Sequence, residues 1–197
     1  MVDAGIGRLL ISSLHQGIAD VLPSRLEFYE GWLSPKGMRD GRIGLAPLGA
    51  VLSFVHREEP PANEQIVERA GRYAADWTFA GLSGLRRWYI RKLPTGARSR
   101  AALSLGKKLI LATVRESKVK TRIDGASAGI GIKSALFDQL RDPATIPMRR
   151  FYASAIARLL EQCGIDAEVG ITNRLQGDWS LAITVRGTRP AEALDAA

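Results

Sequence analysis

The 197-residue chain is poor in the residues that build disulfides and most metal sites. Cys163 is its one cysteine, and His15 and His56 are its two histidines. A single cysteine excludes an intramolecular disulfide and a cysteine-rich zinc site, and two histidines argue against a histidine-rich metal site. Neither histidine has a partner at ligand spacing, and no Ser-His-Asp arrangement can be argued from them. Cys163 precedes Gly164 near a predicted helix end, which favours a buried apolar side chain over a nucleophile.

The chain also lacks a long apolar run. No stretch approaches the roughly 18–20 uncharged apolar residues that span a bilayer. Near the N-terminus, Asp3 precedes the first apolar residues and Ser12-Ser13 interrupt them, which matches a signal peptide poorly. Hydrophobic residues make up 46% of the sequence, the proportion of a globular protein. We therefore expect a folded cytoplasmic protein, either soluble or peripheral to a membrane.

Acidic side chains are nearly missing from residues 86–122. This segment holds 12 Lys and Arg and a single acid, Glu116, so its net charge of +11 exceeds the +8 of the whole chain. Such a block of one sign stays solvated or meets an anionic partner. The basic residues are Arg86, Arg87, Arg91, Lys92, Arg98, Arg100, Lys107, Lys108, Arg115, Lys118, Lys120 and Arg122.

Three interpretations of this segment stay open: a solvated surface, a docking face for an anionic membrane or an acidic protein, and a nucleic-acid-binding face. Trp88 and Tyr89 lie inside the cluster and suit a membrane interface, because each ring has an apolar body and a polar tip. Nucleic acid is less favoured, because no base-reading motif accompanies the charge. The candidate partner-binding residues are Trp88 and the basic residues from Arg86 to Lys120.

Hydrophobic spacing predicts a mixture of helices and strands without repeats, which indicates a single α+β domain. Helices are predicted for residues 6–21, 63–79, 85–93, 97–116 and 149–163, the last with Gly164 as its C-cap. Strands are predicted for 118–123, 168–172 and 180–185, with a flexible loop at 125–131. Periodicity does not decide between helix and strand for residues 46–55.

Several runs of the sequence resemble a 4-vinyl reductase domain. FYASAIARLLEQCG at 151–164, AEV at 167–169 and GDWSLAITV at 177–185 resemble its end. AGRYAADW at 70–77, followed by KLP at 92–94, is similar to the middle of the bacteriochlorophyll 4-vinyl reductase-like members. The resemblance covers residues 64–185 and implies a TRAPP-like α+β fold. In that fold a small antiparallel sheet of four strands packs with helices, and many members are dimers.

The resemblance also implies a function and a domain division. Members are linked to binding hydrophobic small molecules, including aromatic effectors and tetrapyrrole pigment intermediates, as carriers or assembly factors as readily as reductases. Many members have cysteines at the positions of Asn173 and Leu181, so metal or thiol chemistry is not implied here. We expect residues 1–60 to be an N-terminal helical or irregular extension packed on the core, 61–188 the family domain and 189–197 a frayed tail.

Aromatic residues and two neighbouring arginines form a candidate pocket for a flat hydrophobic ligand. Such pockets are mostly apolar with a few polar anchors, and Arg149 and Arg150 could hold a ligand carboxylate by bidentate contact. In the alternative interpretation, the aromatic residues belong to the core and the arginines are exposed. The candidate ligand-binding residues are Trp77, Phe79, Phe137, Arg149, Arg150, Phe151, Tyr152 and Ile156.

Together these patterns predict a non-catalytic binding or assembly protein. Its ligand would be a hydrophobic small molecule such as a tetrapyrrole, with no metal site expected. Its basic face would dock on an anionic membrane or an acidic protein, and the chain could form a homodimer. Two alternatives stay open: a structural subunit of a larger complex without a ligand, and a tetrapyrrole-modifying reductase. The sequence has no dinucleotide-binding fingerprint, which counts against the reductase.

Overall fold

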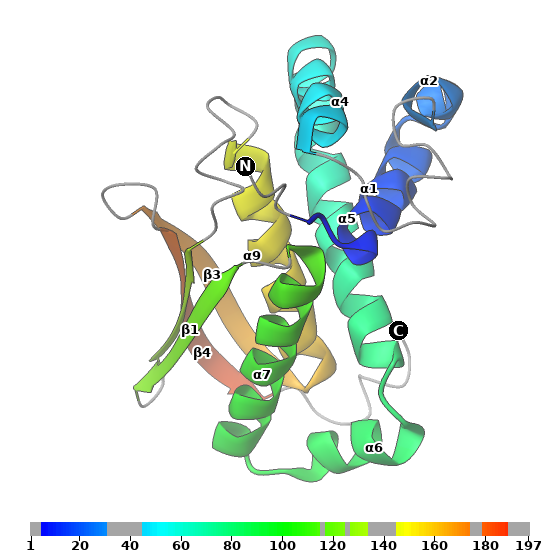
Figure 1. Cartoon of the computed structure of the whole chain (residues 1–197). Helices are drawn as coiled ribbons and strands as arrows, with labels where there is room; N and C mark the ends of the chain where they lie inside the picture. Colours follow the sequence, from blue (N-terminus) through cyan, green and yellow to red (C-terminus); the bar gives the residue numbers. More distant parts are fainter. Residues whose placement is uncertain are drawn as a thin grey trace.

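Helices stack on one face of an antiparallel sheet (Figure 1). The computed structural model describes residues 5–30, 45–114, 117–124, 127–133, 145–173 and 179–188. The helices are α1 (Arg8–Val21), the 3-10 helix η1 (Pro23–Arg25), α2 (Leu26–Glu30), α4 (Leu45–Glu58), α5 (Pro60–Ala80), α6 (Gly84–Lys92), α7 (Thr95–Thr113) and α9 (Thr145–Gln162). The strands are β1 (Lys118–Asp124), β2 (Ser127–Lys133), β3 (Ile165–Asn173) and β4 (Trp179–Thr188). The predicted α+β class is confirmed.

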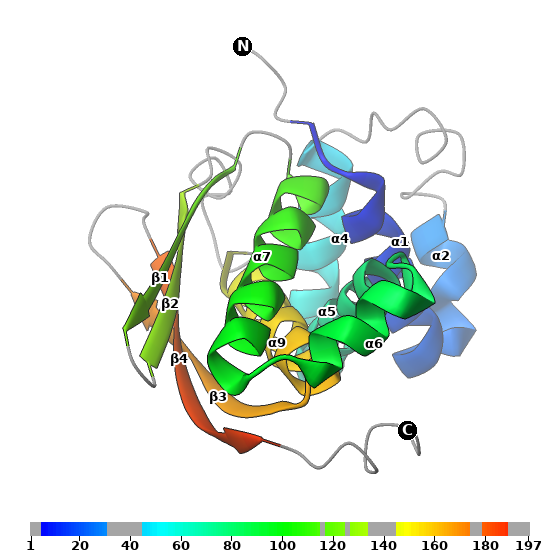
Figure 2. The same ribbon diagram turned by 90° about the horizontal axis from the view of Figure 1, so that it is seen from below.

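Two helices lie directly against the sheet, and the others stack behind them. α7 and α9 cover its inner face, α5 packs on α9, and α1 and α4 pack on α5 (Figures 1 and 2). Among the described residues, no helix covers the outer face of the sheet. α6 lies at one end of the helical layers, below α5 and α7 in Figure 1.

The four-stranded sheet has the order β1-β2-β4-β3, and each neighbouring pair is antiparallel. Side chains alternate between its two faces. Ile130 and Ile132 of β2 and Leu181 and Ile183 of β4 are buried under the helices. The intervening positions face outward. The sheet is thus apolar on its helix side only, as an antiparallel sheet with one covered face requires.

The predicted flexible loop at 125–131 is wrong for residues 127–131, while Gly125 and Ala126 lie outside the described residues. Residues Ser127–Lys133 form β2, an inner strand of the sheet. Gly129 and Gly131 alternate with the buried Ile130 and Ile132. β2 pairs with β1 on one side and with β4 on the other, so its backbone groups are satisfied. Pairing on both edges outweighs the low strand propensity of glycine.

The remaining elements follow the predicted order, with ends shifted by a few residues. The undecided segment at 46–55 is helical, as part of α4. Gly164 has a φ of 73° and ends α9 as predicted. That left-handed conformation is open to glycine without steric cost, and it turns the chain directly from α9 into β3.

A hydrophobic core runs through the described residues from Ile6 to Ile183. α1 and α5 approach closely, since a Cβ on Gly17 would lie 2.6 Å from the backbone oxygen of Ile66. The predicted boundary at residue 60 coincides with the start of α5, and both sides of it contribute to this core. The division into an extension and a family domain stays a prediction. The predicted tail at 189–197 lies outside the described residues.

Candidate functional site

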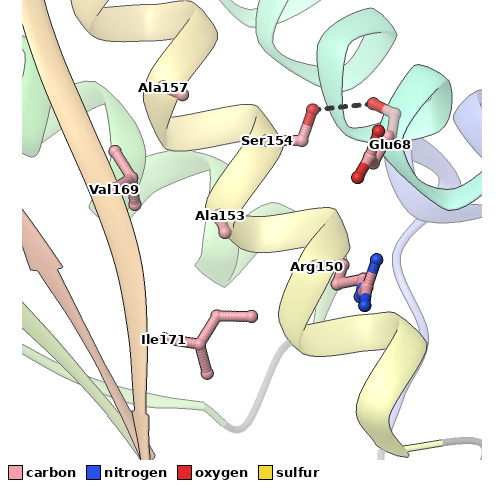
Figure 3. A pocket seen from close by; sticks show the side chains of 7 residues that line it. All are labelled: Glu68, Arg150, Ala153, Ser154, Ala157, Val169 and Ile171. Atoms are coloured by element: carbon pink, nitrogen blue, oxygen red, sulfur yellow. Dashed lines mark hydrogen bonds between the residues drawn. The ribbon is translucent and has the colours of Figure 1, made fainter. Parts of the chain in front are cut away.

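A pocket of about 450 Å³ opens between α5, α9 and β3 (Figure 3). Its volume lies within the range of small-molecule sites, roughly 300–1,000 Å³. The lining residues are Glu68 of α5, Arg150, Ala153, Ser154 and Ala157 of α9, and Val169 and Ile171 of β3. The β3 side chains make one wall apolar, while Glu68 and Arg150 place one charge of each sign on the side of α5 (Figure 3).

The sequence of α9 creates this pocket. Residues 150, 153, 154 and 157 follow the spacing i, i+3, i+4, i+7 and therefore share one helix face. Three of the four are Ala or Ser, so this face stays hollow beside β3. The large apolar side chains of α9 lie on its other faces and are buried in the core.

Polar contacts join α5 to α9 beside the pocket. The Ser154 hydroxyl donates a hydrogen bond to the backbone carbonyl of Glu68 at 2.8 Å. The Arg150 guanidinium forms an ion pair with Glu64 at 2.7 Å. The two helices touch through their backbones, because a Cβ on Gly71 would lie 2.3 Å from the carbonyl oxygen of Phe151. The Arg150 guanidinium is thus held at the rim by a partner that is itself exposed to solvent.

Of the predicted ligand-binding residues, Arg150 lines the pocket. Phe151, Tyr152 and Ile156, on the same helix, are buried in the core. Phe79 is buried near the end of α5, with the Arg91 guanidinium carbon 5.9 Å from its ring centroid. The structure therefore does not gather the predicted aromatic residues around this pocket.

The other three candidates lie elsewhere. Trp77 is 40% exposed on α5, and its ring centroid lies 5.8 Å from that of Tyr73. Arg149 is partly buried on α9, outside the set that lines the pocket. Phe137 lies outside the described residues. A ligand contact by any of these side chains stays a prediction.

Tyr152 illustrates how the buried aromatics serve the core. Its hydroxyl lies 2.7 Å from the Thr113 hydroxyl, which donates its own proton to the Ile110 carbonyl at 2.7 Å. Because a hydroxyl carries one proton, Tyr152 is the donor to Thr113. Burial raises the pKa of Tyr152 far above its usual value. This hydrogen bond joins α9 to α7 inside the protein.

Sequence reasoning missed most of the pocket. The sequence did carry one signal for the pocket. Ala153, Ser154 and Ala157 are small residues that share one helix face with Arg150. Glu68 and Ile171 carried no such signal. They reach the site only because α5 and β3 pack on either side of α9.

The basic segment divides between structural roles and exposed surface. Arg91 Nε donates to the Gln162 carbonyl at 3.4 Å, and an Arg98 guanidinium nitrogen donates to the Gly164 carbonyl at 3.3 Å. Both cations therefore satisfy carbonyls at the C-terminal end of α9, where positive charge is favoured.

The remaining basic residues of the segment point in two directions. On β1, Lys118, Lys120 and Arg122 alternate with Val119, which packs against the core, so they lie on the outer face of the sheet. Those on the helices are exposed or partly exposed: Arg86, Arg87 and Lys92 on α6, and Arg100, Lys107 and Lys108 on α7. Arg122 pairs with Asp124 at 3.3 Å. Arg115 lies outside the described residues, and a partner for the segment stays a prediction.

Two further features concern metal binding and membrane insertion in the described ranges. There, no group of three or more His, Cys, Asp and Glu side chains is placed to hold a metal ion. None of the described helices combines the length and the hydropathy that crossing a bilayer requires.

The fold is similar to that of H-NOX (heme nitric oxide/oxygen binding) proteins. The H-NOX protein from K. algicida, solved in its Fe(II) unliganded form, is 10% identical, and 93% of this chain and 98% of that chain align with a TM-score of 0.60. A point mutant of that protein is also 10% identical, with a TM-score of 0.61 over 92% and 97% of the two chains. A double mutant of the Tt H-NOX protein is 11% identical, with a TM-score of 0.52 over 94% and 97%. At these identities the likeness shows the fold alone.

No family model matches the chain, and a search of curated proteins finds no match. The assignment to the 4-vinyl reductase domain and the TRAPP-like family is wrong, because the fold that aligns along more than nine-tenths of the chain is that of H-NOX proteins. The runs that carried the resemblance describe a general pattern. A core helix ends at Gly164, and two antiparallel strands with buried alternate residues follow. Many sequences meet those physical requirements.

Proposed function

We propose that the chain is a non-catalytic binding domain that takes an amphipathic small molecule with a carboxylate in the α5–α9–β3 pocket. The observation that carries this proposal is one pocket that combines small apolar walls with the Arg150 guanidinium at its rim. The apolar walls contact a hydrophobic body, and a guanidinium pairs with a carboxylate through two parallel hydrogen bonds. Tetrapyrroles with carboxylate side chains belong to this chemical class.

The likeness to H-NOX proteins supports a tetrapyrrole within that class. Those proteins are described as heme nitric oxide/oxygen binding, and their solved chains align with this one along nearly their full length. A similar fold at 10% identity does not show that this chain has the residue that ligates the iron. Whether this chain holds heme therefore depends on its own side chains.

The described residues do not fit a heme whose iron is held by the protein. Proteins hold heme iron through His, Cys, Met or Tyr, and the pocket is lined by none of these. The His56 ring nitrogen lies 3.3 Å from the Asn63 side-chain nitrogen, and His56 is not among the residues that line the pocket. His15 lies on α1, which packs on α5 behind the pocket. Neither imidazole is placed to ligate iron there.

The buried candidates are also unsuited. Met148 and Cys163 are fully buried in the core, and Tyr152 is committed to Thr113. Cys163 does not line the pocket, and burial in the core raises the pKa of its thiol to about 12. α7 and α9 also lie in direct contact, since a Cβ on Gly106 would lie 2.3 Å from an Ile156 side-chain carbon. The proposed binding therefore does not involve iron.

The pocket chemistry favours binding over catalysis. Ser154 directs its proton to a backbone carbonyl, and the Arg150 guanidinium has donors but no acceptor for a substrate proton. Among the lining residues, Glu68 is the one carboxylate, and no imidazole or thiol lies beside it. An activated nucleophile needs an adjacent base that is oriented in turn by a third group. The lining residues do not provide this arrangement of nucleophile, base and orienting group.

Titration with protoporphyrin IX, metal-free and iron-loaded, tests the proposal through porphyrin absorbance. We expect the two forms to bind equally, because none of the residues that line the pocket ligates iron. Arg150→Met should weaken binding by about tenfold or more, the loss of a charge-assisted hydrogen bond. Ala153→Leu should abolish binding by filling the pocket, and Glu68→Gln should tighten it by removing repulsion of the carboxylate.

Arg72→Met is the matched control. Arg72 is an exposed arginine of α5 that pairs with Glu161 at 3.6 Å, outside the pocket. Its replacement should leave the affinity unchanged. Absence of saturable binding below about 100 μM would exclude a tetrapyrrole as the ligand. Tighter binding of the iron form, with an absorbance shift that shows axial ligation, would show that the protein holds heme after all.

A further inference from the structure

The helix α6 exposes an apolar face to solvent. Leu85 is 77% exposed, Trp88 58% and Tyr89 59%, whereas Ile90 is buried against the rest of the molecule. Positions 85, 88, 89 and 92 follow i, i+3, i+4, i+7 spacing, so Lys92 joins the three apolar residues on one face. Exposure of three large side chains on one short helix is unusual when burying each would be favourable.

The helix is locally well formed although it packs sparsely. The Ser83 side chain caps it by accepting a hydrogen bond from the Arg86 backbone nitrogen at 3.4 Å. Ile90 and the Arg91 contacts to Phe79 and Gln162 attach its inner side. These contacts attach α6 to the helical layers, at whose lower end it lies in Figure 1.

Positive charge surrounds this face. Residues 84–113, which span α6 and α7, contain eight Lys and Arg and no Asp or Glu. Arg86, Lys92 and Arg100 are exposed close to it in the sequence. The carboxylates near the adjoining ends of α5 and α9 are already engaged, since Arg158 lies 2.7 Å from Asp76 and 3.0 Å from Glu161. Within the described ranges, Asp76 and Glu161 are therefore paired with Arg158 rather than with the cations of α6.

We propose that α6 docks the protein on an anionic lipid bilayer, with its exposed apolar face in the headgroup region and the surrounding cations on lipid phosphates and carboxylates. Trp and Tyr are favoured at this depth, where the ring body is dehydrated and the polar tip stays hydrated. Long cationic side chains reach outward to the headgroups while their stems lie along the apolar layer. The surface lies apart from the α5–α9–β3 pocket, so this proposal is independent of the ligand.

A bilayer fits this surface better than an acidic protein does. Protein interfaces centre on anchors that enter complementary pockets on the partner. Here three apolar side chains protrude together from a convex helix, with cations on either side in the sequence. A fluid headgroup layer accepts that shape without a matching cavity, and its negative potential complements the charge.

Flotation with vesicles of phosphatidylcholine, with and without about 30% phosphatidylserine, tests the proposal on the full chain. We expect binding to the anionic vesicles only, with loss at high salt. The Trp88 emission should shift to shorter wavelength on binding, measured as the difference between the wild type and Trp88→Phe. Trp88→Ala should weaken binding about tenfold, through loss of buried apolar area.

Charge reversals supply the matched comparison. Arg86→Glu changes the charge on α6 by two units and should weaken binding about 25-fold, at roughly fivefold per charge. Arg57→Glu makes the same change at the end of α4, next to the start of the 21-residue α5 and thus about 30 Å from α6. It should alter binding by less than about threefold, because the Debye length at physiological salt is about 8 Å. Leu85→Ser is a second apolar variant if Trp88→Ala lowers the melting temperature.

Four results would overturn the proposal. The first is equal binding to neutral vesicles, and the second is an unchanged affinity in Trp88→Ala and Leu85→Ser. The third is a Trp88 shift produced equally by soluble polyglutamate or DNA, which would assign the face to another polyanion. The fourth is a concentration-dependent dimer that buries Trp88, which would assign it to a second copy of the chain.

Discussion

Two helices of this protein differ in the burial of their aromatic residues. α9 buries Phe151 and Tyr152 completely and packs against α5, α7 and β3. α6 leaves Trp88 and Tyr89 more than half exposed and anchors itself chiefly through Ile90. Both sequences contain adjacent aromatic residues preceded by two arginines, RRFY at 149–152 and RRWY at 86–89. The same local pattern therefore serves the core in one place and the surface in the other.

The difference lies in what surrounds each helix. α9 lies between another helix layer and the sheet (Figure 1), and its large apolar side chains from Met148 to Leu160 are buried. α6 lies at the end of those layers and has one buried hydrophobic residue of its own. Aromatic residues in α9 therefore stabilise the fold, whereas those of α6 add little to stability. The exposure of Trp88 and Tyr89 is therefore not explained by the stability of the fold.

The largest expected effect is on the core side of this comparison. Phe151→Ala should lower the free energy of unfolding by about 3–5 kcal/mol, because it leaves a cavity at the junction of α9 with its neighbours. Urea denaturation followed by circular dichroism measures this loss. A loss below about 1 kcal/mol would show that the core relaxes around the gap and that α9 is not packed as described.

A substitution at the contact between α5 and α9 should lower the stability of the protein nearly as much. A Cβ on Gly71 would lie 2.3 Å from the carbonyl oxygen of Phe151, so Gly71→Ala should force the helices apart and cost about 1–3 kcal/mol. Gly96→Ala is the control, since a Cβ there meets nothing within 4 Å. That change should be neutral or stabilising, as expected for alanine in a helix. Equal thermal stability of the two variants would contradict the close contact.

The buried thiol makes stability depend on pH. Burial raises the pKa of Cys163 from 9.0 to about 12 in the folded state. The unfolded thiol then ionises at lower pH than the folded one, so its contribution is complete below pH 9.0 and is lost as the pH rises from 9.0 toward 12. We expect a loss of about 1 kcal/mol between about pH 8.5 and about pH 10.

Cys163→Ala separates this effect from other titrations. It should lower stability at neutral pH but remove most of that slope, measured by urea denaturation at each pH. Tyr152 acts in the same direction at higher pH, because burial raises its pKa from 10.0 as well. An unchanged slope in Cys163→Ala would show that the thiol is not the titrating group.

The sequence predicted those parts of the fold that local spacing encodes. α9 could be predicted because its buried residues recur at helical intervals and Gly164 ends it. The glycines of β2 predict a loop, because they mask an alternation that strand pairing on both edges makes stable. The family resemblance was wrong for a related reason. It rested on a helix–glycine–strand pattern that many α+β sequences share.

The pocket lay beyond sequence reasoning because it is a tertiary feature. Glu68 and Ile171 line the same pocket from elements on either side of α9, although 102 residues separate them in the sequence. Arg150 was identified from its chemistry. The neighbouring aromatics were assigned to the same site because sequence adjacency does not reveal which helix face points to the core. The charge of the 86–122 segment was evident, but its division between α6–α7 and the outer face of the sheet followed from the register of β1.

The smallest expected effect tests the surface side of the comparison. Trp88→Ala should change the free energy of unfolding by less than about 0.5 kcal/mol, because a side chain that is 58% exposed in the folded state loses little contact with the protein. The same substitution at a buried position such as Trp179 should cost several kcal/mol, about 3–5. Urea denaturation of the two variants side by side measures the contrast. A loss above about 1 kcal/mol for Trp88→Ala would mean that α6 buries this ring against the protein, and the face would then no longer be free to meet a bilayer.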